Sequence, residues 1–474
     1  MTYPNVLVLD YMQTTGNANP ELQMQAESYV GTGYQRLLTF EAPGGGFSLF
    51  GSPPAEVFLT AYGLMQLDDM AQVYPVDRAV IERAAKWLLE QQYEFEGTWR
   101  ADDYRAGRGR LGVTSYVAWA LVEAGFEDTR QVAEAINYIR DQALQEKDAY
   151  SLALAANALA AYDPQDLVAR QVIDALYEMR VEEGDTVHWQ MGGTSFMGAT
   201  GQSGSVETTA LAAYALMRAG AHLDAAQGAL AYLLQAKDSW GTWGSTQATI
   251  LSLKALLLAS EQGGRAAGQA TIRVSLNGEL AQEILVDETN ADVVHLVTFD
   301  HGFSPTGDDE VQIDVEGGGN LMVQVTSRYY LPWDRVPAAP PDQEPVTVDL
   351  RYDRTELAVN DLVTADVRVQ LHKEGVVKMA LIDLGVPPGF APLTEDLNRL
   401  VEAGLIARYE LTGRQVIVYL EDLSSGAPVT FSYRLRARFP MRAQTPPSSA
   451  YDYYNPESPA IRAPLLLTVR EGDL

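Results

Sequence analysis

The sequence predicts a multidomain chain with an α/α toroid first and β-sandwich domains after it. A small residue followed by a leucine recurs through the first 260 or so residues, and about 40 or about 57 residues separate one such leucine from the next. A repeat of this length is typical of helical hairpins that bury their apolar faces only against one another. Beyond about residue 268 the apolar period changes from 3.6 to 2, which indicates strands. The recurring leucines are Leu64, Leu121, Leu159, Leu216 and Leu256.

A second repeat marks the turns between the hairpins. A glutamine, five residues and then Gly-Thr-Trp occur twice with identical spacing, each time just before a helix rich in small residues. Glycine adopts the left-handed conformation that ends a helix. The tryptophan ring can then pack beneath the next helix, where its burial contributes roughly 2–3 kcal/mol. We predict that Gly97, Trp99, Gly241 and Trp243 form structural turns of the toroid. Looser copies are expected at Gly45-Gly46-Phe47 and at Gly192-Gly193 with Phe196.

Helical signals follow one another from residue 1 to residue 265. Pro20 and Asp77 stand where helices begin, and Gly125, Gly220 and Gly263 stand where helices end. In the stretch 77–92 the apolar residues recur at helical spacing and most charged residues lie between them, which predicts an outer helix. The pattern predicts eleven helices, one fewer than the twelve of a ring of six hairpins.

The next segment predicts a thin sheet followed by a linker. Alternating residues from Thr271 to Leu276 precede the hairpin dipeptide Asn277-Gly278. Further strands are expected at Val293–Phe299, Glu310–Val315 and Leu321–Tyr329, too few for a complete sandwich. The stretch 336–346 holds four prolines in eleven residues, which is typical of a linker.

The C-terminal part predicts a second β domain with one helix. Its helix is expected over residues 394–403, with Thr394 as the N-terminal cap and Gly404 as the stop. Strands of a β-sandwich are expected at Val346–Arg351, Leu362–His372, Lys378–Leu384, Ala407–Thr412, Gln415–Leu420, Thr430–Ala437 and Ala463–Val469.

Composition excludes several classes of function. The formal net charge of −29 disfavours nucleic acid or an anionic membrane as a partner. Without cysteine the chain forms no disulfide, thiolate metal site or cysteine nucleophile. The five histidines lack the spacing of metal ligands, so we expect no metal and no cofactor. The first residues lack the cationic start of a signal peptide, and no apolar run reaches about 20 residues.

The order of these parts resembles the C-terminal half of the alpha-2-macroglobulin and complement thioester family. Several stretches also resemble that family in sequence, in the family's own order and over nearly the whole chain. They are Tyr3-Pro4-Asn5-Val6-Leu7-Val8-Leu9-Asp10-Tyr11, Gly33-Tyr34-Gln35-Arg36, Ser205-Val206-Glu207-Thr208-Thr209, Gly244-Ser245-Thr246-Gln247-Ala248-Thr249 and Tyr451-Asp452-Tyr453-Tyr454.

The resemblance implies a division into domains. Residues 1–265 are similar to the thioester-containing ring domain, and residues 266–335 to the second half of a CUB-like domain. A linker at 336–346 then leads to residues 347–474, which are similar to the receptor-binding macroglobulin domain. In relatives a pair of lysines on the helix of that last domain binds a receptor, whereas residues 394–403 offer only Arg399 among acids. Binding to that kind of receptor is not expected.

The chain departs from the family at the reactive centre. In the family a Cys-Gly-Glu-Gln motif, whose cysteine and glutamine side chains form a thioester, comes shortly before the Tyr-Pro-Asn-Val-Leu stretch. This sequence has no cysteine and begins just after that point. We therefore expect Met1 to be an internal methionine of a longer protein, which would also explain the missing helix and the thin sheet. The alternative is a member that works without a thioester.

The turn after Trp99 is expected to border an upstream thioester. Complement relatives hold a histidine there that favours transfer to hydroxyls, and the stretch 102–105 has none, which favours amines. The neighbours of the thioester would be Asp103, Tyr104 and Arg105. An ordinary surface loop explains these residues equally well.

Other chemistry on a toroid has weaker support. Terpene cyclases use an Asp-x-Asp-Asp motif, whereas Asp68-Asp69 and Asp102-Asp103 are isolated pairs. A glycosidase would place two carboxylates across the ring, and Glu207 is the best candidate for one of them. A hydrogen-bonded glutamate in a helix's first turn is the simpler explanation of Glu207. For His188-Trp189 a packed ring beside a solvated histidine is the simpler one.

By resemblance, the chain is the C-terminal part of a broad-spectrum endopeptidase inhibitor, a protease trap that is not itself an enzyme. Its partners would be proteases, bound together with an N-terminal part of the protein, and its location extracellular, at the cell surface or periplasmic. The first alternative is a toroid enzyme acting on a carbohydrate or isoprenoid. The second is a scaffold or adhesion protein without a thioester.

Overall fold

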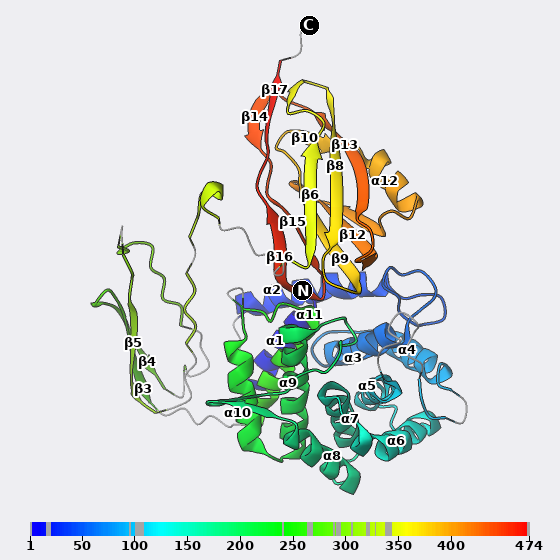
Figure 1. Ribbon diagram of the computed structural model, residues 1–474. Coiled ribbons are helices and arrows are strands. Elements are labelled where there is room, and N and C mark those ends of the chain that lie inside the picture. The colour runs from blue at the N-terminus through cyan, green and yellow to red at the C-terminus, as the bar shows by residue number, and fades with distance from the viewer. Residues whose placement is uncertain are drawn as a thin grey trace.

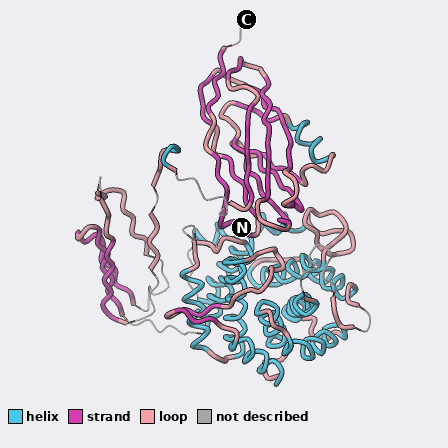
Figure 2. The backbone as a smooth tube through the Cα atoms, in the orientation of Figure 1, coloured by secondary structure: helices cyan, strands magenta, loops and turns pink. Residues whose placement is uncertain are grey.

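The chain folds into a helical ring, a small sheet beside it and a β-sandwich above it (Figure 1). The computed structural model describes residues 2–15, 20–93, 96–99, 109–238, 241–262, 269–287, 290, 295–304, 307–318, 323–327, 329–336 and 344–471. Most helices lie in the ring, and most strands lie in the small sheet and the sandwich (Figure 2). Of the helices that these residues form, none has the length and apolar character to cross a membrane.

Six inner helices form a closed ring. Each contacts the next along the chain, and the first helix contacts both the second inner helix and the last, which closes the circle. The alanine, glycine and serine residues of these helices permit the helices to approach one another closely. Most faces of each inner helix carry buried side chains. The inner helices are α1 (Thr2–Thr15), α3 (Val57–Val73), α5 (Arg110–Glu123), α7 (Ala149–Tyr162), α9 (Gly201–Ala219) and α11 (Thr246–Gln262).

The outer helices are amphipathic. Helix α4 buries Val80, Ile81 and Leu88 against the ring, and its N-terminal cap Asp77 accepts a hydrogen bond from the N–H of Ala79. With these outer helices, eleven α-helices precede residue 263 among the described residues, the number that the sequence predicts. The outer helices are α2 (Pro20–Leu38), α4 (Arg78–Glu90), α6 (Arg130–Gln142), α8 (Leu167–Glu178) and α10 (Leu223–Gln235).

Short elements connect some of the hairpins. A 3-10 turn, η2 (Ala143–Gln145), follows α6, and the hairpin of β1 (Val181–Glu183) and β2 (Thr186–His188) follows α8. Gly220 ends α9 with a φ of 62°, a left-handed conformation that glycine adopts without steric cost.

The small sheet has the antiparallel order β4-β3-β5, with β3 (Ala270–Leu276), β4 (Glu279–Val286) and β5 (Val311–Gly317). Asn277 and Gly278 both have positive φ, as a two-residue hairpin turn requires. The strands expected at Val293–Phe299 and Leu321–Tyr329 are wrong for the described residues 295–299 and 323–327, which join no strand. An alternating apolar pattern makes a strand only where a neighbouring backbone pairs with it.

The C-terminal domain is a β-sandwich of two main sheets, ordered β10-β13-β8-β6 and β11-β12-β9-β15-β16, with a smaller sheet β14-β17-β7 at one end. Buried aliphatic side chains from both main sheets, such as Val369, Ile382 and Leu435, form its core. The strands are β6 (Val346–Tyr352), β7 (Glu356–Ala358), β8 (Leu362–Leu371), β9 (Val376–Gly385), β10 (Phe390–Pro392), β11 (Arg408–Leu411), β12 (Gln415–Ser424), β13 (Val429–Ala437), β14 (Met441–Gln444), β15 (Ser448–Asp452), β16 (Asn455–Arg462) and β17 (Leu466–Arg470). A 3-10 turn, η3 (Trp333–Arg335), precedes them.

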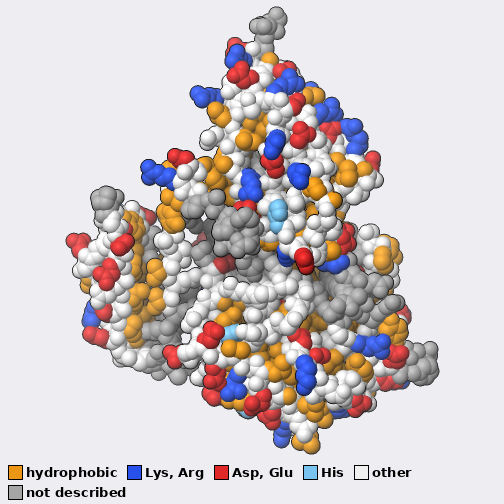
Figure 3. Space-filling model, viewed as in Figure 1, with side chains coloured by type: hydrophobic (Ala, Val, Ile, Leu, Met, Phe, Trp, Pro, Cys, Tyr) orange, Lys and Arg blue, Asp and Glu red, His pale blue; other side chains and the backbone are white. Residues whose placement is uncertain are grey.

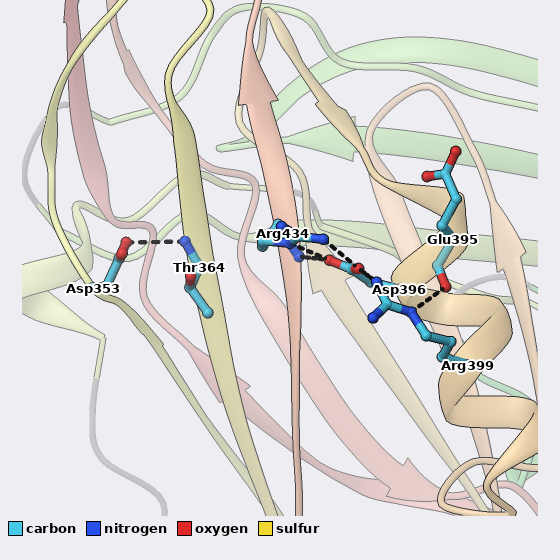
Figure 4. Close-up of polar contacts among 6 residues, drawn as sticks. All are labelled: Asp353, Thr364, Glu395, Asp396, Arg399 and Arg434. Carbon is cyan, nitrogen blue, oxygen red and sulfur yellow. Dashed lines mark hydrogen bonds and ion pairs between the residues drawn. The ribbon is translucent and has the colours of Figure 1, made fainter.

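One helix, α12 (Thr394–Glu402), packs beside the sandwich. The expected cap at Thr394 is wrong, because Thr394 is already helical and Leu393 precedes it without a side-chain cap. The helix is held instead by Asp396, which accepts hydrogen bonds from the backbone N–H and the guanidinium of Arg434 on β13 (Figure 4). Gly404 follows with a φ of 66°.

Candidate functional site

Repeated turns shape one end of the ring, where the inner helices begin; we call this end the ring mouth. At four of these turns the backbone N–H of an aromatic residue donates to a threonine hydroxyl on the following inner helix. The pairs are Phe47 with Thr60 at 2.8 Å, Trp99 with Thr114 at 3.4 Å, Trp189 with Thr209 at 3.0 Å and Trp243 with Thr249 at 3.1 Å.

The tryptophan rings also hold the outer helices. The indole Nε1 atoms of Trp99, Trp189 and Trp243 donate to backbone carbonyls near the ends of α4, α8 and α10, at 2.7, 2.7 and 2.6 Å. Each ring is buried, so each turn joins the end of an outer helix to the start of an inner one. Gly97 and Gly241 precede two of these rings with φ of 65° and 82°.

The copy expected at Gly192-Gly193 with Phe196 is wrong, because Trp189 fills that role. The threonine that accepts from the Trp189 N–H comes 20 residues later in the sequence. The corresponding threonine comes 15 residues after Trp99 and 6 residues after Trp243, so no fixed sequence spacing identifies these hydrogen bonds. The solvated histidine expected at His188 is also wrong. His188 is buried and stacks on Tyr232, with ring centroids 4.9 Å apart.

Aromatic side chains fill the ring mouth. Phe196 stacks on Phe58 from the first turn of α3, with centroids 4.8 Å apart. Tyr150 and Tyr116 also pack against Phe196, with ring centroids 5.7 and 6.0 Å from the centroid of Phe196. All four side chains are buried, so the mouth is packed with aromatic rings.

The tip of the β15–β16 hairpin of the sandwich docks on the ring mouth. The side-chain oxygen of Asn455 accepts from the N–H of Thr200 at 2.6 Å and from the Thr200 hydroxyl at 3.0 Å. The Asn455 amide nitrogen donates to the carbonyl of Gly198 at 3.0 Å. Thr200 immediately precedes α9, so this contact lies at the entrance of the ring.

Two tyrosines at the hairpin tip complete the contact. The ring of Tyr454 lies directly over Gly198, where an added Cβ would come within 2.9 Å of it. Tyr453 packs edge-on against Tyr454. Burial, together with the nearby Glu410 carboxylate, raises the pKa of Tyr453. Burial, with Tyr453, also raises the pKa of Tyr62 on α3. At the edge of the contact Arg36 lies 3.7 Å from Glu410.

The carboxylates considered as catalytic candidates have structural partners. Glu207 is fully buried, and its Oε1 accepts from the hydroxyl of Ser245 at 3.2 Å. Asp69 lies 2.6 Å from the ammonium of Lys254 and also accepts from the Tyr3 hydroxyl. Asp68 and Asp69 belong to the C-terminal half of α3, whereas the ring mouth lies at the N-terminal ends of the inner helices.

The predicted thioester neighbours Asp103, Tyr104 and Arg105 lie outside the described residues, as does the pair Asp102-Asp103. The residues that bring the sandwich to the ring mouth, Asn455 and Thr200, were missed by sequence reasoning. The only available signal was the Tyr451-Asp452-Tyr453-Tyr454 stretch, which ends one residue before Asn455.

A closed α/α ring with a terminal β-sandwich docked on its mouth defines a class of multidomain proteins built from an α/α toroid and β domains. Residues 1–258 match the model of the A-macroglobulin TED domain, and residues 375–463 match that of the A-macroglobulin receptor binding domain. The chain therefore belongs to the A-macroglobulin TED domain family.

Relatives and solved structures agree with this assignment. Ovostatin of Gallus gallus is 22% identical over 480 residues, which cover 97% of this chain and 32% of ovostatin. Thioester-containing protein 1 allele S3 of Anopheles gambiae is 23% identical over 474 residues, with 97% and 34% covered. The chain thus spans about a third of the length of these curated relatives.

The fold is shared with bacterial alpha-2-macroglobulins. Native alpha-2-macroglobulin from Escherichia coli, from domain MG7 to the C-terminus, superposes with a TM-score of 0.66 at 19% identity, covering 97% of this chain and 70% of that one. Salmonella alpha-2-macroglobulin reacted with methylamine gives a TM-score of 0.64 at 17% identity, covering 97% and 28%. The α/α toroid followed by β domains that the sequence predicts is confirmed.

Proposed function

We propose that this chain is the C-terminal portion of an alpha-2-macroglobulin-like broad-spectrum endopeptidase inhibitor that traps proteases. The longer protein would work outside the cell or in the periplasm, and its partners would be proteases. This portion would serve as the shield and the moving part of the trap, without catalytic turnover of its own.

The observation that carries this proposal is the docking of the sandwich on the ring mouth through Asn455 and Tyr454. Helix α1 begins with Thr2, and in relatives the reactive thioester lies shortly before this helix. A trap with an acyl group at this position needs a cover that excludes water until a protease is caught. The hairpin tip and the packed aromatic rings of the mouth would form such a cover.

The proposed domain division follows the family. Residues 1–265 would be the thioester-containing ring, 266–335 the second half of a CUB-like domain, 336–346 a linker and 347–474 the receptor-binding-type sandwich. The small sheet supports the second assignment, because Leu280 and Leu285 on β4 are 58% and 65% exposed. Figure 3 shows hydrophobic side chains gathered on this part of the surface. An exposed apolar sheet of this kind is typical of a face that another part of the protein covers.

The proposal is tested by binding. The longest natural gene product that contains this chain is incubated with active trypsin-like, chymotrypsin-like and elastase-like proteases, and with the same proteases inactivated at their catalytic residue. We expect co-migration on a native gel with all three active proteases and with none of the inactive ones, since a trap closes only after cleavage. Equal binding of inactive protease would contradict a trap and favour a scaffold.

A further inference from the structure

A small cavity lies on the side of the sandwich, where the edge strand β6 runs beside β15 and β16 (Figure 1). Its lining comes from β6 and from the chain segments that lead into β15 and out of β16. The cavity has a volume of about 190 Å³, roughly the share of six molecules in liquid water, and is smaller than the pockets that hold drug-sized ligands. A ligand that fits it is therefore a small one.

One part of the lining is an unpaired strand edge. The N–H of Asp353 donates to the carbonyl of Thr364, and the N–H of His372 donates to the carbonyl of Pro345. These bonds show that the odd-numbered residues of β6 face β8, so the even-numbered ones turn their N–H and C=O away from it. Leu350 is one of these, and its backbone has no hydrogen-bond partner within the described part of the chain. Leu350 thus offers a ligand one donor and one acceptor.

Two buried hydroxyl groups also line the cavity. Thr445 and Ser448 are only 5% and 4% exposed. The Thr445 hydroxyl oxygen accepts from the N–H of Leu465 at 2.9 Å, and the Ser448 hydroxyl oxygen accepts from the N–H of Gly385 at 3.1 Å. Each hydroxyl still has a hydrogen to donate, and neither hydrogen has an acceptor among the residues that the structure describes. Both hydroxyls are therefore free to donate to a ligand.

The charged groups of the cavity already have counter-ions. Arg462 donates to both carboxylate oxygens of Glu344, at 3.2 and 3.0 Å, and Asp349 lies 2.8 Å from Arg351. Glu344 and the carbonyl of Ile461 use three of the five N–H groups of Arg462, so two remain for a ligand. Because each charge is paired, the cavity favours a neutral polar ligand over a small anion or cation.

We propose that this cavity binds one neutral sugar ring. Sugar hydroxyls both donate and accept, which matches the two hydroxyl donors, the free N–H groups of Arg462 and the unpaired edge at Leu350. Leu465 and Ala463 supply apolar contact for the C–H groups of the ring. Ala463 is exposed, so a ring can enter beside it while the rest of a glycan stays outside. Such a site would attach the terminal sandwich to a glycan, which goes beyond the trapping of a protease.

Saturation-transfer difference NMR on the full chain tests this binding. The probes are glucose, galactose, mannose and N-acetylglucosamine, each as the free sugar and as its methyl glycoside. We expect at least one of them to bind with a Kd of about 1–10 mM, as is usual for a ligand of this size. Binding of the methyl glycoside would identify the end of a glycan as the source of the ring, and binding of the free sugar alone would identify a free monosaccharide.

Two variants locate the bound sugar. Ala463→Phe fills the cavity without removing a hydrogen bond, so we expect the sugar signal to disappear. Arg462→Met keeps the aliphatic stem and removes the donors, which should weaken binding by about threefold to tenfold. The matched control is Ala427→Phe, at an exposed alanine between β12 and β13, and it should bind like the unchanged chain. Thermal unfolding verifies the fold of each variant, and Ala463→Leu replaces Ala463→Phe if the latter does not fold.

Three results would overturn the proposal. The absence of a sugar signal with the unchanged chain would show that the cavity holds only water. Equal signals from Ala463→Phe and Ala427→Phe would place the sugar elsewhere. Binding of inorganic phosphate that Ala463→Phe abolishes, without binding of a sugar, would show an anion site. None of these measurements involves a protease, so a failure of the sugar site leaves the proposed function untouched.

Discussion

The ammonium of Lys254 lies 2.6 Å from a carboxylate oxygen of Asp69, inside the ring between α11 and α3. Tyr3 of α1 donates its hydroxyl to the same carboxylate, and the Lys254 ammonium lies 5.7 Å from the centre of the Tyr3 ring. This cluster joins the first inner helix of the chain to the second and to the last. Asp69 raises the pKa of Lys254 against the opposing effect of burial, so the lysine stays charged.

Breaking this pair should destabilise the ring strongly. Lys254→Met leaves the Asp69 carboxylate, which is 27% exposed, without its counter-ion. Because removing one partner of a fully buried pair costs about 3–5 kcal/mol, we expect a loss of about 2–3 kcal/mol at this partly buried one. Urea unfolding followed by helical circular dichroism gives this free energy. The control is Lys86→Met, whose exposed pair with Glu90 at 3.8 Å should be worth less than about 0.5 kcal/mol. Similar losses for the two variants would show that the Lys254 pair does not close the ring.

Gly97 should tolerate no side chain. Its φ is 65°, and an added Cβ would lie 2.6 Å from the carbonyl oxygen of Glu134. Gly97→Ala combines left-handed strain with a backbone clash, so we expect a loss of about 2–4 kcal/mol in the free energy of unfolding. Gly125→Ala isolates the strain, because Gly125 has a φ of 83° and nothing within 4 Å of its added Cβ. Its loss should be about 1 kcal/mol.

The indole hydrogen bonds should contribute measurably to stability. Trp99→Phe keeps an aromatic ring but removes the indole donor from the carbonyl of Leu88, which retains only the backbone N–H of Gln91 at 3.0 Å; we expect a cost of about 1 kcal/mol. Trp333→Phe, at a ring that is largely outside any core, should change stability by less than about 0.5 kcal/mol. Thermal unfolding of both variants under one buffer condition makes the comparison. Equal melting temperatures of the two variants would show that the indole hydrogen bond makes no measurable contribution to stability.

Asp68 should make the ring more stable as the pH falls from about 7 to about 5. Burial, with Asp69 next to it, raises the pKa of Asp68 to about 6, against the lowering effect of Arg78. Because this pKa is higher in the folded than in the unfolded state, the folded state binds the proton more tightly, and the destabilisation present above pH 6 is relieved on protonation. We expect a gain of about 1 kcal/mol after solvent screening.

Asp68→Asn should remove that part of the pH dependence while the rest of the curve stays unchanged. The measurement is the free energy of unfolding in urea between pH 5 and pH 8 for both chains. Asp383 in the sandwich also has a pKa raised to about 6 by burial, so only the difference between the two curves reports on Asp68. Parallel curves would show that Asp68 is not responsible.

Local patterns predicted much of the fold because each depends on neighbours in the sequence. The period of the leucines identified five of the six inner helices, and Asn277-Gly278 identified its hairpin, since two positive φ angles are a local requirement. The strand pattern at Val293–Phe299 misled because a strand also needs a pairing neighbour. Thr394 looked like a helix cap, but Asp396 is tied to Arg434, 38 residues away.

The candidate site depended on contacts that no local pattern contains. Asn455 meets Thr200 across 255 positions of sequence, and the short stretch before it indicated a family without indicating a partner surface. Trp189 was assigned to a packed ring, but its relation to Thr209 was hidden because residues 190–200 lie between the tryptophan and the start of α9. Only the closed ring brings such residues together.

The most direct test of the central claim compares a trapped protease on two substrates. The longest natural gene product that contains this chain is mixed with trypsin, with the gene product in molar excess. The trypsin is then assayed on casein and on a small chromogenic peptide. A trap shields the protease without blocking its active site, so we predict that casein cleavage falls more than tenfold while peptide cleavage changes less than twofold. Equal inhibition on both substrates, or no inhibition of either, would contradict the assignment of this chain to a protease trap.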